Sequence, residues 1–108
     1  MAVMIGFAER RRELLEAELQ RMAGELPMLG VERSYLTGDL ARGEVEVGSA
    51  LELVLVRETD EPFRRRADFF VSHLQPRVAT HFWVYTPEEF DELGERDPVL
   101  RRALADNA

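Results

Sequence analysis

The 108-residue sequence contains no cysteine and no lysine, and its fourteen basic residues are all arginine. Without cysteine there is no disulfide, no thiol nucleophile and no thiolate-bound metal. Without lysine there is no Schiff base and no ammonium group to bind a phosphate. The acidic residues outnumber the basic ones, and a net charge of −7 gives no electrostatic reason to expect a nucleic acid as a partner.

Long hydrophobic runs are also absent. No apolar stretch approaches the roughly 20 residues that span a bilayer, and the first residues place their charges after the apolar positions, the reverse of a secretory signal. We therefore expect a cytoplasmic protein with no membrane partner. The apolar fraction of 45% is ordinary for a globular protein, and the length predicts a single domain over residues 1–108.

Two long helices are predicted from the spacing of apolar residues. Hydrophobic side chains recur every three or four positions over residues 7–24 and again over 63–74, as on one side of an amphipathic helix. Arginines 64–66 near the start of the second helix are expected to lie off its buried side. We interpret them as a solvated face; the alternative is a contact with a partner's carboxylates or phosphate.

Three strands and two helix starts complete the pattern. Residues 51–56 are apolar on both faces and predict a central strand covered by helices, while 31–37 and 78–85 predict its neighbours. Thr86, Pro87 and Glu89 form a capping-box signature, and Asp97 followed by Pro98 starts a last helix. This order predicts an α/β (α+β) fold with a small, mixed three-stranded sheet and helices packed on it.

The segment 35–56 carries a motif between the first two strands. Its residues are Gly38, then Ala41, Arg42 and Gly43, and then Ser49. In this layout the chain resembles the polymerase-beta-like nucleotidyltransferases, and most closely their minimal, single-domain members. The resemblance implies a nucleotidyltransferase-like fold. It also implies weak nucleotide contacts at Gly38, Asp39, Arg42 and Ser49.

The positions that carry the family's chemistry are replaced. Asp39 stands for the motif serine, Ala50 for the first aspartate and Glu52 for the second. The family reaction, as the resemblance implies it, needs Mg²⁺ ions held by carboxylates. Ala50 offers no ligand, and no acidic residue lies between positions 68 and 88 to provide a third carboxylate. We therefore expect no catalytic residue and no cofactor, and we regard these three positions as vestigial.

Two histidines and one aspartate need a separate interpretation. His73 and His81 have no serine or cysteine partner at a motif spacing, so neither is expected to be catalytic. Asp39 is expected to be the N-cap of the short helix that follows it.

Two functions remain open from these residues. In the first, the chain has lost catalysis and acts through protein–protein contacts; the resemblance then implies an antitoxin-like partner of an all-helical HEPN-type protein. In the second, it is a Mg²⁺-dependent nucleotidyltransferase of weak or partner-dependent activity. That enzyme would bind a nucleoside triphosphate and use Asp39 and Glu52, with Glu52 as a metal ligand.

The first residues are more apolar than an exposed terminus requires. Surplus hydrophobic surface on a small protein usually marks an interface. We expect the interface with a second copy or a helical partner to include Val3, Met4, Ile5 and Phe7. The alternative is that this segment packs against the sheet of its own chain.

Overall fold

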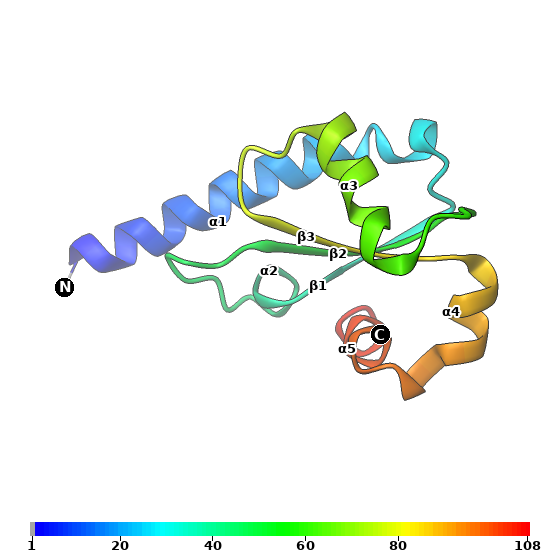
Figure 1. Cartoon of the computed structure of the whole chain (residues 1–108). Helices are drawn as coiled ribbons and strands as arrows, with labels where there is room; N and C mark the ends of the chain where they lie inside the picture. Colours follow the sequence, from blue (N-terminus) through cyan, green and yellow to red (C-terminus); the bar gives the residue numbers. More distant parts are fainter. Residues whose placement is uncertain (1) are drawn as a thin grey trace.

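A mixed sheet of three strands forms the centre of the protein (Figure 1). The structure is a computed structural model that describes the backbone of residues 2–108 and the side chains of residues 6–108. Strand β2 (Leu51–Val56) lies between β1 (Arg33–Thr37), to which it is antiparallel, and β3 (Thr80–Tyr85), to which it is parallel. The predicted fold class and the central position of residues 51–56 are confirmed.

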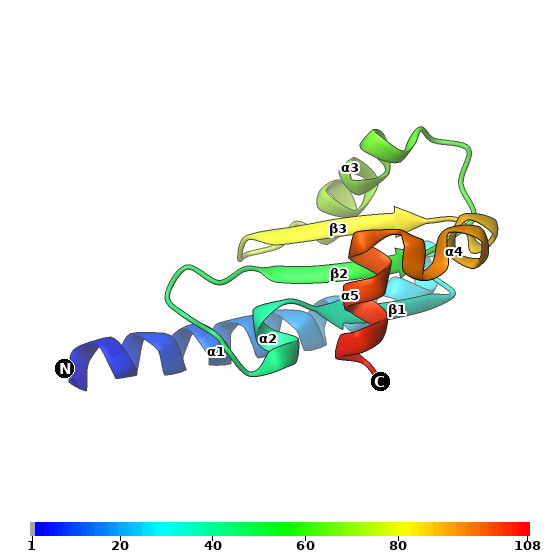
Figure 2. The same ribbon diagram turned by 90° about the horizontal axis from the view of Figure 1, so that it is seen from below.

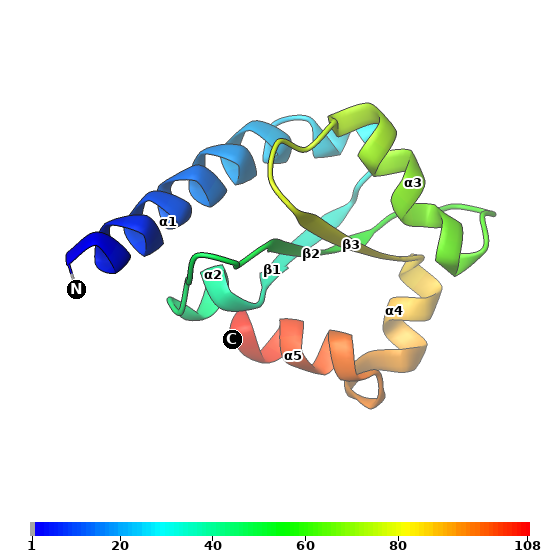
Figure 3. The ribbon, with the colours of Figure 1, turned by 60° about the vertical axis from the view of Figure 1, so that its left-hand side comes forward.

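Helices cover both faces of the sheet (Figure 3). Helices α1 (Ala2–Ala23) and α3 (Phe63–Leu74) cover one face, where the leucines of β2 meet apolar residues of both helices. Helices α4 (Pro87–Leu93) and α5 (Pro98–Asp106) cover the other, where Val54 and Val56 pack against Phe90 and Leu100. Seen from below, α5 lies across the strands and ends beside α2 (Asp39–Arg42) (Figure 2).

The predicted boundaries agree best where the local signals are strongest. Strand 51–56 and helix 63–74 match the prediction, and Thr86 and Glu89 form the expected capping box. β1 and β3 each begin two residues later than predicted, and α1 begins at Ala2 rather than at residue 7. Two short 3₁₀ helices, Leu26–Leu29 and Gly94–Arg96, follow α1 and α4. Within residues 2–108, none of the helices combines the length and the apolar character needed to cross a membrane.

The arginine cluster of α3 is not uniformly solvated, and the prediction is wrong for Arg66. Arg64 and Arg65 are exposed, but Arg66 is only 7% exposed. Its guanidinium donates to both carboxylate oxygens of Glu89, at 2.5 and 3.0 Å, and to the carbonyls of Glu61 and Val84. Because Arg66 precedes Phe70 by four residues, it lies on the buried side of the helix. There it joins α3 to α4.

Candidate functional site

Gly38 occupies a position that only glycine can fill. It joins β1 to α2 with φ 89° and ψ −157°, a backbone conformation that residues other than glycine strongly disfavour. The space beside it is also taken, since a Cβ atom would lie 2.0 Å from Oε2 of Glu52. Two of the predicted motif positions, Gly38 and Glu52, are therefore in direct contact.

The prediction that Asp39 is a helix N-cap is wrong. Gly38 is the N-cap of α2, its carbonyl accepting from the Arg42 amide at 3.1 Å, and Asp39 is the first helical residue. The Asp39 carboxylate instead accepts a hydrogen bond of 2.7 Å from the Ser49 hydroxyl. That hydroxyl accepts in turn from the amide of Glu46 at 2.8 Å. Asp39 therefore holds the loop that leads into β2.

The Glu52 side chain is held by a residue of the C-terminal helix. Its Oε1 atom accepts from Arg102 of α5 at 3.1 Å, and the Glu52 side chain is 21% exposed. Arg102 also lies over Trp83, its guanidinium carbon 5.7 Å from the ring centroid. His81 is the register partner of Glu52 on β3, and it is exposed and stacked on Trp83 at 5.8 Å.

A second residue of α5, Asp106, reaches the same turn. One oxygen of its carboxylate accepts from the Thr37 hydroxyl at 2.6 Å, from the Gly38 amide at 3.1 Å and from Arg42 at 3.2 Å. The side chain is only 9% exposed, so these charge-assisted bonds replace its hydration. The hydrogen bond from Thr37 is the largest of the effects that lower the pKa of Asp106 below its usual value; the Gly38 amide and the positive charge of Arg42 add to it, against the opposing effect of burial. The carboxylate is therefore charged at neutral pH.

Arg42 lies among three acidic side chains, one of them from α5. Its guanidinium contacts Glu44 at 3.0 Å and Asp106 at 3.2 Å, and lies 3.7 Å from Asp39. Through its contact with Asp106, Arg42 holds α2 against α5.

The residues present do not fit the Mg²⁺ ions that the resemblance to nucleotidyltransferases implies. Magnesium needs several oxygen ligands in a tight octahedron. Asp39 is bound to Ser49, Glu52 to Arg102, and Ala50 has no ligand atom. Among the residues that the structure describes, no three histidine or acidic side chains lie close enough together to hold a metal ion.

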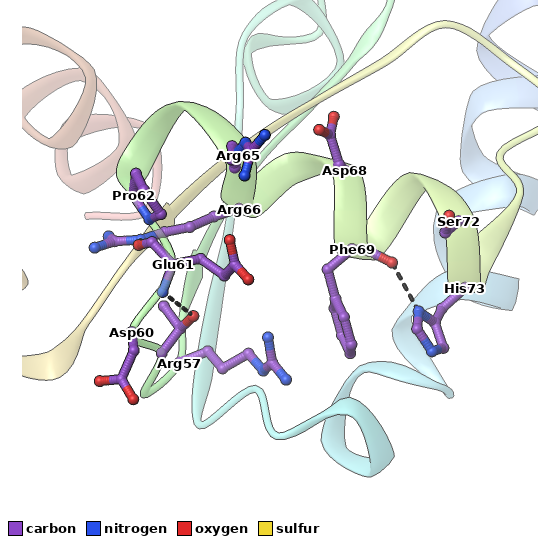
Figure 4. Close-up of a pocket in the computed structure, with 11 residues that line it drawn as sticks. Arg57, Asp60, Glu61, Pro62, Arg65, Arg66, Asp68, Phe69, Ser72 and His73 are labelled. Atoms are coloured by element: carbon purple, nitrogen blue, oxygen red, sulfur yellow. Dashed lines mark hydrogen bonds between the residues drawn. The ribbon is translucent and has the colours of Figure 1, made fainter.

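A separate groove of about 860 Å³ lies at the opposite end of β2, between the loop after the strand and α3 (Figure 4). Arg57 extends over the ring of Phe69 at 3.9 Å, and His73 is turned back onto the carbonyl of Phe69 at 2.8 Å. Three arginines and three acidic residues line the groove. Their charges balance, so the groove has no evident preference for a charged ligand.

Sequence reasoning did not find Arg102 and Asp106. They lie 50 and 68 residues from their partners Glu52 and Gly38, and no local motif marks them. Of the predicted interface residues, the side chains of Val3, Met4 and Ile5 lie outside the described residues. Phe7 is 52% exposed.

Comparison with known proteins gives one informative match. Neither the protein-family models nor the curated proteins match this sequence significantly. Among solved structures, the chain is similar to the crystal structure of a "putative nucleotidyltransferase" from Sulfolobus solfataricus, with a TM-score of 0.51 and 22% identity. The match covers 82% of this chain and 78% of the other. At this identity it shows the fold, which is nucleotidyltransferase-like.

Proposed function

We propose that this chain, with its nucleotidyltransferase-like fold, has lost nucleotidyl transfer and acts through contacts with another protein. The observation that carries the proposal is that α5 engages both parts of the motif. Arg102 neutralises Glu52, and Asp106 takes up the Gly38 amide and the Arg42 guanidinium. At this turn a nucleoside triphosphate needs hydrogen-bond donors for its phosphates, and it would meet the Asp106 carboxylate there instead. Two like charges about 4 Å apart repel by roughly 4 kcal/mol at a protein surface.

The partner follows from the resemblance to minimal nucleotidyltransferases. We propose an all-helical HEPN-type protein, for which this chain serves as the antitoxin-like half of a two-protein system. The net charge of −7 favours a protein partner over a nucleic acid. Co-expression with a neighbouring HEPN gene product tests this: we expect the two to co-purify and this chain to relieve growth arrest. A HEPN protein whose toxicity and yield do not change on co-expression would contradict the partner assignment.

Loss of catalysis is tested by thermal unfolding with each nucleoside triphosphate and Mg²⁺ or Mn²⁺. A ligand at 100 times its dissociation constant stabilises a protein by about 2.7 kcal/mol. For a chain of this size that is a rise in melting temperature of roughly 10 °C or more. We expect no rise. A nucleotide-dependent rise that a chelator removes would contradict the proposal.

One observation supports the second function, a weak or partner-dependent Mg²⁺-dependent transferase. The Arg102 side chain is 42% exposed, and an ion pair this accessible contributes only about 0.2–1 kcal/mol. A partner that moved α5 would release Glu52. Variant Glu52→Ala separates the two functions: any metal- and nucleotide-dependent activity of the complex should disappear in this variant if Glu52 binds the metal. Activity that persists would exclude Glu52 from that role.

A further inference from the structure

Helix α1 exposes an apolar stripe that its own chain leaves uncovered. Phe7 is 52% and Leu14 50% exposed, and Ala17 is also exposed. Spacings of seven and three residues place them on one side of the helix. Leu15 and Met22, which are fully buried against the sheet, lie on a neighbouring side. The stripe is therefore separate from the surface that attaches α1 to the core.

The first half of α1 projects beyond the sheet (Figures 1 to 3). The Cα radius of gyration is 14.5 Å, against about 13 Å for a compact chain of this length. The accessible surface is 6810 Å², against roughly 6,100 Å² for a folded monomer of this mass. The difference, about 700 Å², is close to the roughly 800 Å² that one partner contributes to a standard interface. The molecule thus exposes more surface than a compact chain of its mass, by an amount comparable to one side of a dimer interface.

The charges beside the stripe suggest what covers it. Most charged residues of α1 already have partners in their own chain: Arg12 with Glu9 and Glu16, Arg21 with Glu18 and Glu25, and Arg11 with the Ser49 carbonyl. Within the described part of the chain, Arg10 and Glu13 make no ion pair, and both are exposed. Around the helix, both lie on the same side of the line from Phe7 to Leu14 as Ala17 does: Arg10 lies between Leu14 and Ala17, and Glu13 lies beyond Ala17. That side, called the flank below, therefore carries one unpaired charge of each sign.

We propose that α1 pairs with the α1 helix of a second copy, antiparallel about a two-fold axis. In that arrangement each flank meets the same flank of the second copy in reverse order, so Arg10 faces Glu13 of the second copy, and Glu13 faces its Arg10. Phe7 then packs against Leu14 and Ala17 of the second copy. A two-fold axis makes all these contacts twice. A parallel pair would bring the two flanks to opposite sides and leave Arg10 and Glu13 without partners.

The pairing goes beyond the proposed function and does not depend on the loss of catalysis. Phe7 belongs to both this surface and the predicted interface. The contact is a single helix pair, at the small end of stable interfaces. The dimer is therefore expected to form in the micromolar concentration range.

Sedimentation equilibrium of the full chain across the micromolar range tests the pairing, with no nucleotide present. The wild-type chain should dimerise, and Leu14→Glu should raise the dissociation constant at least tenfold. Met28→Glu is the matched control, because Met28 is 86% exposed and lies outside α1; its dissociation constant should not change. Circular dichroism and thermal unfolding verify that each variant is folded.

Charge exchange tests the antiparallel arrangement. Arg10→Glu alone places two acidic residues opposite each other, and Glu13→Arg alone places two arginines there, so each variant should dimerise at least tenfold more weakly. Mixing the two single variants restores both opposite-charge pairs, so a heterodimer should form.

Three outcomes would overturn the proposal: a wild-type monomer at all concentrations, a dimer insensitive to Leu14→Glu, or single charge variants that fail to recombine. If the chain is a monomer and its stripe becomes buried only when a different protein binds, the surface belongs to that partner instead. None of these results would alter the thermal-shift test of catalysis, so the two proposals fail independently.

Discussion

Removal of the Asp106 carboxylate should destabilise the protein substantially, although Asp106 is the last residue of the last helix. Asp106→Ala deprives three donors of one shared acceptor: the Thr37 hydroxyl, the Gly38 amide and Arg42. Thr37 is 1% exposed, so its hydroxyl would be left largely without water. Hydrogen bonds to a charged group contribute about 1.5–3 kcal/mol each, and these three are not additive. We expect a loss of roughly 2–4 kcal/mol in the free energy of unfolding.

Urea denaturation at neutral pH measures this loss. Asp106→Asn keeps the shape and one acceptor oxygen but removes the charge, so its loss should be intermediate. Asp91→Ala is a matched control, because Asp91 is exposed on α4; it should change stability by no more than about 0.5 kcal/mol. If Asp106→Ala behaved like this control, the carboxylate would not hold α5 against the motif turn.

Acidification gives an independent check on the same residue. The folded pKa of Asp106 is lowered, chiefly by the hydrogen bond from Thr37. A group with a lowered folded pKa stabilises the fold above its unfolded pKa, near 4, and loses that contribution as the pH falls through the folded value. The stability difference between wild type and Asp106→Asn should therefore shrink as the pH falls below about 4. A difference that stays constant would refute the assignment of charge to this site.

Two further predictions concern the motif glycine and the attachment of α1. Gly38→Ala should cost about 2–4 kcal/mol, from backbone strain and displacement of Glu52. Gly43→Ala is the control: Gly43 has φ 71° and open space around it, so this substitution should cost only about 1–2 kcal/mol. Equal losses of stability for the two variants in chemical denaturation would contradict the close approach of Glu52 to Gly38. The Arg21 guanidinium, aided by the Arg77 amide, lowers the pKa of the 5%-exposed Glu18 to about 2. Acid titration should show up to about 3 kcal/mol lost as the pH falls from about 4.5 to 2, and a Glu18→Gln variant with unchanged acid sensitivity would exclude this role.

Local chemistry determined much of the fold. The strand over residues 51–56, the helix over 63–74 and the capping box at Thr86 follow from apolar periodicity and hydrogen-bonding groups a few residues apart. The end of the first strand at Gly38 was also recognisable from the sequence, whereas the positive φ of Gly38 was found only in the structure. These signals involve near neighbours in the chain, and neighbours keep their spacing whatever the tertiary fold.

The wrong predictions concern polar groups whose partners are distant in sequence. Arg66 was expected in solvent, but it is buried because Glu89 lies 23 residues away in a position to pair with it. Aspartate is a favoured N-cap residue, yet the Asp39 carboxylate accepts a hydrogen bond from Ser49, and Gly38 is the N-cap of the helix. The propensity of a polar residue indicates which kinds of hydrogen bond it can make, but the partner that it has in the folded protein depends on the tertiary structure.

The sequence by itself determined the central strand, the long helices and the place of the motif glycine, because periodicity and glycine positions are local properties. The resemblance of that layout to nucleotidyltransferases predicted the fold, which the structure bears out. Only the tertiary structure decided what those positions contact. It placed Arg102 on Glu52, and Asp106 on the Gly38 amide. The physical reason is that ion pairs and hydrogen bonds across 50 or more residues depend on how α5 crosses the sheet. Apolar packing against Val54 and Val56 sets that crossing, and the order of the charged residues along the chain does not.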